Sequence, residues 1–185
     1  MPGFTIHIAI AKEYARKHRN EIKNTEEFIE GAIAPDYLCL IDNNINKNIT
    51  HYGEWGDWTS KEQTIYLDEF LKDNKVNLDK EYWKGYFIHL LTDYYFDNKY
   101  FSKEMKRAKE NKETFYNDYD CLNSKLIEKY HIEKIEKIKK YMCSINDRPK
   151  YLDNNKIIEF IDKMSDINLE EKAKLIREEG MEGIK

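Results

Sequence analysis

Residues 79–97 read DKEYWKGYFIHLLTDYYFD and form the most apolar helical segment of this 185-residue chain. Aromatic and aliphatic side chains are so dense here that a helix would be apolar on nearly every side. A helix of that kind is buried in the middle of a protein rather than laid on its surface. The segment therefore predicts a central helix around which the rest of the chain packs.

The N-terminal part of the chain predicts two helices with identifiable ends. Thr5 is a candidate N-cap for a helix that extends to about residue 20, and a second helix begins near Thr25. That second helix is expected to end near Ala34, because Pro35 disfavours helical geometry in the residue before it. Asp36 would then lie just beyond the helix, on a turn.

The remainder of the chain shows helical spacing of apolar residues and no strong strand alternation. We therefore expect an all-α, single-domain helical bundle over residues 1–179, followed by a frayed tail over 180–185. A chain of this length can bury one sizeable core. Further helices are expected near residues 60–73, 101–111, 113–130, 132–145, 153–164 and 168–179.

The composition is that of a soluble helical protein, with 36% charged and 41% hydrophobic residues. The net charge of −4 gives no general basic field, so nucleic acid is not the expected partner. The start of the chain lacks a basic leader, and no run of about 18 apolar residues predicts a transmembrane helix. The scattered Cys39, Cys121 and Cys143 suit reduced thiols, so a cytoplasmic protein is expected.

Residues 42–59 read DNNINKNITHYGEWGDWT, without sustained periodicity, and are interpreted as a long loop. Long loops in compact domains are often functional. Tyr52, Trp55 and Trp58 in this loop could contact an apolar part of a substrate, or they could pack back onto the bundle.

His89 and Asp93 lie four residues apart on the predicted central helix, so their side chains share one face and can reach the same ion. A carboxylate on a buried helix is costly unless it is paired or bound to a metal. Gly85, one turn before His89, would leave room beside the pair. A salt bridge or ordinary hydrogen bonding is the alternative interpretation.

Three further residues, His7, Asp36 and His51, complete a candidate ligand set. Taken singly, His7 could be an ordinary core histidine, Asp36 a turn residue and His51 a solvated loop histidine. Together with His89 and Asp93, they offer nitrogen and oxygen ligands that suit zinc, with iron or manganese as alternatives.

Four segments occur in the order TIHIAIA (5–11), GAIAPD (31–36), THYG (50–53) and GYFIHLLTDYYFD (85–97). This ordered set of His, Gly-x-x-x-Pro-Asp, His and His-x-x-x-Asp resembles the zinc-dependent phospholipase C family, which is similar in fold to the single-strand-specific zinc nucleases. The resemblance covers about the first 100 residues and implies an all-helical bundle that binds metal ions.

The resemblance also implies roles for individual residues. Asp36, His51, His89 and Asp93 look like ligands of one zinc ion, and Asp93 looks like a bridge to a second ion near His7. The implied activity is hydrolysis of a phosphoric ester, small-molecule or lipid, by water that the metal activates. Asp36 is the implied catalytic base as well as a ligand.

The chain departs from the secreted phospholipases in its first residues and after the central helix. Those enzymes use a free N-terminal tryptophan as a ligand, whereas this chain begins MPGF. They also use later histidines, whereas residues 94–103 read YYFDNKYFSK and residues 112–120 read KETFYNDYD. One or two zinc ions are therefore expected rather than three, with Asp118 as a candidate additional ligand.

Two alternatives stay open at this point. An HD-type nucleotide phosphohydrolase is also helical and metal-dependent, but it uses an adjacent His-Asp pair, which this chain lacks. The other alternative is a non-catalytic, metal-stabilised helical interaction protein. The absence of ligands for a third ion is consistent with it. His18 and His131 lie among Arg, Lys and Glu residues and are interpreted as surface residues.

Overall fold

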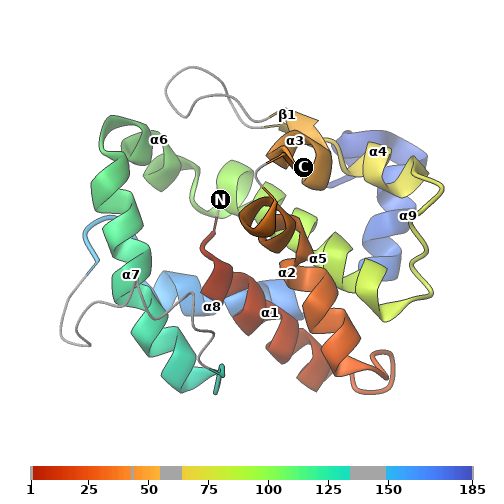
Figure 1. The fold of residues 1–185 in the computed structure, drawn as a ribbon, viewed down its shortest axis with the longest axis horizontal. Helices are drawn as coiled ribbons and strands as arrows, with labels where there is room; N and C mark the ends of the chain where they lie inside the picture. Colours follow the sequence, from red (N-terminus) through yellow and green to blue (C-terminus); the bar gives the residue numbers. More distant parts are fainter. Residues whose placement is uncertain (1, 43, 55–63, 134–148, 185) are drawn as a thin grey trace.

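The computed structural model describes residues 2–42, 44–54, 64–133 and 149–184, and the structural statements below concern these residues. They form an all-α, single-domain bundle with a small two-stranded antiparallel sheet (Figure 1). Trp55, Trp58 and the expected 132–145 helix from residue 134 onward lie outside the described residues. The elements are α1 (Phe4–Lys17), α2 (Thr25–Ile41), α3 (Lys47–Thr50), β1 (Gly53–Glu54), β2 (Thr64–Ile65), α4 (Leu67–Lys72), α5 (Glu81–Tyr95), a π-helical turn (Phe96–Tyr100), α6 (Ser102–Glu110), α7 (Lys112–Lys129), α8 (Asn154–Ser165), α9 (Leu169–Glu179) and a 3-10 helix (Gly180–Ile184).

The predicted central helix is confirmed as α5. Phe87, Leu90 and Leu91 are fully buried on it, and each such side chain stabilises the fold by roughly 1.5–3 kcal/mol. α5 packs most extensively against α2 and also contacts α1, α9 and β2. In Figure 1, α6 and α7 lie on one side of α1 and α2, whereas α4 and α9 lie on the other.

Two glycines allow α2 and α5 to approach until their backbones touch. A Cβ placed on Gly31 would lie 1.9 Å from the carbonyl oxygen of Tyr82, and one on Gly85 would lie 1.9 Å from that of Phe28. Any larger residue at either position would force the helices apart. The expectation that Gly85 leaves room beside the site is therefore wrong, because the backbone of α2 fills that room.

α2 continues through Pro35 to Ile41, so the expectation that it ends near Ala34 is also wrong. Proline removes a helical hydrogen bond and costs roughly 3 kcal/mol inside a helix. The packing of α2 against α5 offsets this cost, since Phe28 is fully buried and the backbones of the two helices are in contact. Asp36 consequently lies on a helix rather than on a turn.

Part of the loop expected over residues 42–59 has regular structure. The side chain of Asn46 caps the first turn of α3, His51 directly follows the last residue of α3, and β1 comes next. The helix expected over residues 60–73 is shorter than predicted, since β2 occupies residues 64–65 and α4 begins at Leu67.

The C-terminal residues 180–184 form a 3-10 helix instead of the expected frayed tail. Gly180 has a φ of 65°, which turns the chain after α9, and Ile184 is 2% exposed. This buried isoleucine gives the end of the chain a contact with the core. Among the described helices, none combines the length and the apolar character that crossing a bilayer requires.

Candidate metal centre

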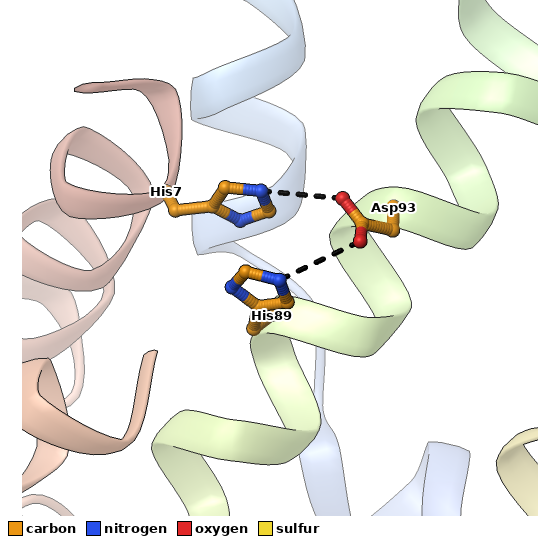
Figure 2. A group of neighbouring side chains, drawn as sticks. All are labelled: His7, His89 and Asp93. Atoms are coloured by element: carbon orange, nitrogen blue, oxygen red, sulfur yellow. Dashed lines mark ion pairs between the residues drawn. The ribbon is translucent and has the colours of Figure 1, made fainter. Parts of the chain in front are cut away.

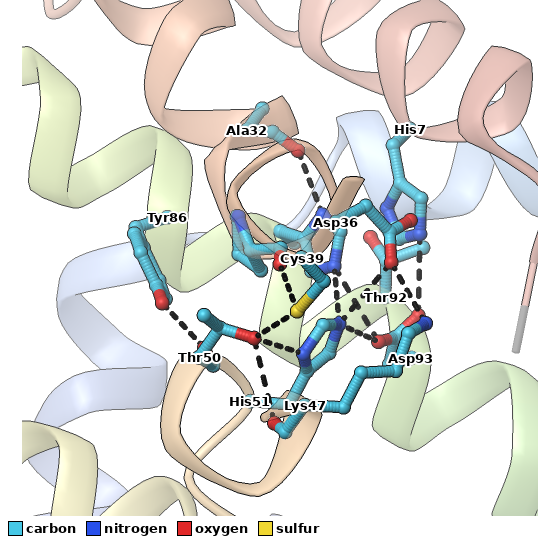
Figure 3. Close-up of polar contacts among 12 residues, drawn as sticks. His7, Ala32, Asp36, Cys39, Lys47, Thr50, His51, Tyr86, Thr92 and Asp93 are labelled. Carbon is cyan, nitrogen blue, oxygen red and sulfur yellow. Dashed lines mark hydrogen bonds and ion pairs between the residues drawn. The ribbon is translucent and has the colours of Figure 1, made fainter. Parts of the chain in front are cut away.

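The five predicted ligand side chains converge in the interior of the bundle. His7 comes from α1, Asp36 from α2, His51 from the position that directly follows α3, and His89 and Asp93 from α5. Figure 3 shows four of these side chains, from separate segments, turned toward one another: His7, Asp36, His51 and Asp93. Among the residues that the structure describes, two groups of three could hold an ion, His7–His89–Asp93 and Asp36–His51–His89, each with its ligand atoms within 4.8 Å of one another.

The first group is arranged around the carboxylate of Asp93 (Figure 2). Its Oδ1 lies 3.2 Å from Nε2 of His7, and its Oδ2 lies 3.5 Å from Nε2 of His89. The rings of His7 and His89 are stacked, with their centroids 3.8 Å apart. The two oxygens of Asp93 therefore face different histidines.

The second group surrounds Nε2 of His51. This atom lies 3.3 Å from Nε2 of His89, 3.4 Å from Oδ1 of Asp36 and 3.6 Å from Oδ2 of Asp93. Ligand atoms bound tetrahedrally to zinc at about 2.0–2.1 Å are separated from one another by about 3.3 Å. Each of these three distances from Nε2 of His51 is therefore close to the separation of neighbouring ligand atoms in a tetrahedral zinc site.

Asp93 and His7 carry buried polar atoms that are not hydrogen-bonded. Within the described residues, neither carboxylate oxygen of Asp93 and neither ring nitrogen of His7 has a hydrogen-bond partner. The 3.2 Å contact between the two side chains is thus an ion-pair distance without hydrogen-bond geometry. Buried polar atoms are costly unless they are satisfied. A metal cation would satisfy them, so both the ligand types and the unsatisfied atoms fit zinc.

A backbone contact orients His89. Its Nδ1 lies 2.7 Å from the carbonyl oxygen of Ala32 on α2, so Nδ1 carries the proton and donates it to that oxygen. The other ring nitrogen, Nε2, is left to face the cluster. Metal-bound histidines are commonly held in this way by a carbonyl on the far side of the ring.

A hydroxyl and a phenol hold His51 in place, and sequence reasoning missed both, although Thr50 directly precedes His51. Thr50 Oγ1 lies 2.8 Å from Nδ1 of His51 and 3.2 Å from Sγ of Cys39. The hydroxyl of Tyr86 on α5 donates to the carbonyl oxygen of Thr50. The end of α3 is thereby tied to both α2 and α5, which directs Nε2 of His51 toward the other ligands.

Burial and the carboxylates set the protonation of the three histidines. Burial and the nearby His89 lower the pKa of His7 to about 4, and burial also lowers the pKa of His51, so both are neutral at pH 7. Burial opposes protonation of His89, but attraction to the charge of Asp93 raises the pKa of His89 overall. An ion that binds Nε2 of His89 would compete with a proton for that nitrogen.

Lys47 is a charged neighbour of the cluster that sequence reasoning missed. Its Nζ lies 3.1 Å from Oδ1 of Asp36. Burial alone would raise the pKa of Asp36, but the hydrogen bond with His51 and the charge of Lys47 hold it well below its ordinary value. Asp36 is thus ionised at neutral pH.

Asp118, proposed above as an additional metal ligand, has a structural role instead. Its carboxylate accepts the backbone N–H groups of Lys150, Tyr151 and Leu152 at 2.6, 2.5 and 2.9 Å. These bonds fasten the segment before α8 to α7. Both oxygens are already engaged there, and Asp118 belongs to neither group that could hold an ion.

Tyr52 and His18 each differ from one of the roles that the sequence suggested for them. The hydroxyl of Tyr52 donates to Asp73 at 2.7 Å and its ring contacts Phe70 edge-on, so Tyr52 packs back onto the bundle. His18 is half-buried rather than a free surface residue, since its ring stacks on Tyr14 with the centroids 4.0 Å apart.

Comparison of the chain with protein-family models, with curated proteins and with solved structures finds no match. The features that bear on function are therefore the geometry of the ligand cluster and the order of its residues along the chain.

Proposed function

We propose that this chain is a metal-dependent hydrolase of phosphoric esters, with one or two zinc ions held by His7, Asp36, His51, His89 and Asp93. The observation that carries the proposal is the convergence of these side chains from separate segments into one buried cluster, with spacings of 3.2–3.6 Å. The resemblance to the zinc-dependent phospholipase C family supplies the reaction class.

The ligands divide between two ion positions. Asp36, His51, His89 and one oxygen of Asp93 would hold the first ion. Because Nδ1 of His89 is bonded to Ala32, this histidine has a single nitrogen to offer and can serve only one ion. His7 faces the other oxygen of Asp93, so these two would contribute to a second ion.

Zinc in such a site supplies Lewis acidity, which stabilises charge on a phosphoryl group and makes nearby water more acidic. The protein side chains do the rest. The buried His7, His89 and Asp93 exclude bulk water from the interior of the cluster. Asp36, ionised and with a 12% exposed side chain, is the ligand that a substrate and its attacking water would meet, so it can accept the proton of that water.

One observation favours a structural metal as the second candidate function. The side chains of His7, His51, His89 and Asp93 are at most 1% exposed, as in a closed structural site. The non-catalytic, metal-stabilised protein is therefore the alternative that an experiment must exclude.

Turnover by zinc-loaded protein separates the two functions. We expect hydrolysis of p-nitrophenyl phosphate or of bis(p-nitrophenyl) phosphate that stops when the metal is removed. Asp36→Asn should lower kcat by roughly a hundredfold or more, as expected for loss of a general base, with the zinc content measured in parallel. His131→Ala is the matched control, because His131 is exposed and outside the cluster. Stoichiometric zinc without turnover of any phosphoester would leave only the structural role.

A further inference from the structure

Lys47 is the cationic side chain at the solvent side of the ligand cluster. It begins α3, one turn before His51, and its side chain is 36% exposed, compared with 12% for Asp36. Figure 3 shows the side chain of Lys47 running alongside His51 toward the carboxylates. A molecule that contacts the carboxylate of Asp36 would therefore lie close to the ammonium group.

The charge of Lys47 has a different consequence with and without a metal. Without an ion, Lys47 compensates the carboxylate of Asp36 at 3.1 Å. With one divalent ion, Asp36 and Asp93 already balance the metal, and the ammonium becomes a surplus positive charge. With one ion, an ionised Asp97 would cancel this surplus, whereas a second divalent ion would add two positive charges and leave a surplus in place. An anion bound beside Lys47 would neutralise what remains.

We propose that Lys47 forms an anion subsite that holds the phosphoryl group of the substrate beside the metal centre, and afterwards the phosphate product. This inference rests on the proposed function and narrows its substrates to esters with a negatively charged phosphoryl group. An ammonium carries three donors, so it can contact a carboxylate and a phosphoryl oxygen at the same time. Neutral phosphotriesters would gain little binding affinity from a contact with the ammonium group.

The test is the binding of inorganic phosphate to zinc-loaded protein, measured by titration calorimetry in the wild type and in Lys47→Met. The variant should bind phosphate about tenfold to a hundredfold more weakly, because one charge-assisted contact is lost. It should bind zinc at least as tightly as the wild type, because a cation beside the metal has been removed. A variant that had merely lost its fold would bind both ligands less well, so the opposite directions identify the anion subsite.

Two further variants serve as controls for the phosphate measurement. Lys47→Arg keeps the charge and should retain phosphate binding within a few-fold of the wild type. Lys72→Met removes a lysine that is 74% exposed and paired with Asp68, and it should change neither affinity. Where turnover is measurable, Lys47→Met should raise KM for anionic esters.

The outcomes separate this inference from the proposed function. Unchanged phosphate affinity in Lys47→Met, or no phosphate binding by the zinc-loaded wild type, would overturn the anion subsite. Phosphate binding that depends on Lys47, without hydrolysis of any ester, would support the subsite and overturn the hydrolase proposal alone.

Discussion

Replacing Gly85 by alanine perturbs the contact that positions the ligand cluster. The new Cβ would lie 1.9 Å from the carbonyl oxygen of Phe28 and 2.8 Å from the backbone nitrogen of Ala32. Both atoms belong to the backbone of α2, so no side-chain rotation relieves the contact, and the helices must separate by roughly 1 Å or more. The same movement would stretch the 2.7 Å bond between Ala32 and His89.

Two opposing terms decide the sign of this substitution. Alanine is favoured over glycine inside a helix by about 1 kcal/mol. Overpacking a close contact costs about 1–3 kcal/mol, and a contact with backbone belongs at the upper end of that range. We therefore expect Gly85→Ala to lower the free energy of unfolding by about 2 kcal/mol, which is roughly 4–8 °C in Tm for a chain of this size.

Thermal melting followed by circular dichroism, with zinc content measured in parallel, tests this expectation. Gly3→Ala is the control, because its Cβ would meet only the side chain of Tyr119, at 3.3 Å. Gly85→Ala should melt earlier than both the wild type and this control, and it should retain less zinc. A variant that melts at or above the wild-type temperature would mean that helix propensity outweighs packing and that α2 and α5 do not meet as described.

Three further predictions concern residues around the cluster. Asp118→Asn should lower the free energy of unfolding by about 2 kcal/mol, because the amide nitrogen that replaces one oxygen cannot accept and leaves one or two of three backbone N–H groups unbonded. The zinc content should stay unchanged, and loss of zinc would restore Asp118 as a ligand. Thr50→Val should weaken zinc binding about tenfold to a hundredfold by releasing Nδ1 of His51, and unaltered affinity in a metal titration would contradict that role. In metal-free protein, His7 stays neutral down to about pH 4 when folded but takes up a proton near pH 6.5 when unfolded. The unfolded state therefore binds more protons between these values, and stability should fall by up to roughly 3 kcal/mol as the pH drops through that window. Denaturant titrations at several pH values should show a smaller loss in His7→Gln, and an identical loss would contradict the assignment.

Local sequence patterns were sufficient to predict the features that depend on residues within a single helix. The central helix and the shared face of His89 and Asp93 follow from spacing along one element. The order of residues also brought Asp36 and His51 into the candidate ligand set, although the local structure expected for Asp36 was wrong. Pro35 signals a helix end, but packing against α5 overrides that signal.

Long-range contacts account for what the sequence did not reveal. Asp118 has a side chain of the type that binds metals, but the backbone N–H groups that it accepts lie more than thirty residues further along the chain. Lys47 stands in an asparagine-rich segment, and its charge matters only because α3 folds against α2. The role of Gly85 likewise depends on which helix crosses it, and spacing within one helix does not specify that.

The zinc content of the purified protein, measured by mass spectrometry alongside melting curves with and without a chelator, tests the metal centre most directly. The wild type should carry one or two zinc ions per chain, and a chelator should lower its Tm, because saturating metal at about a thousand times Kd stabilises the fold by about 4 kcal/mol. His89→Ala and Asp93→Asn should each lose stoichiometric zinc, whereas His131→Ala should keep it. Wild-type protein without stoichiometric metal, whose melting responds neither to chelator nor to added zinc, would contradict the account.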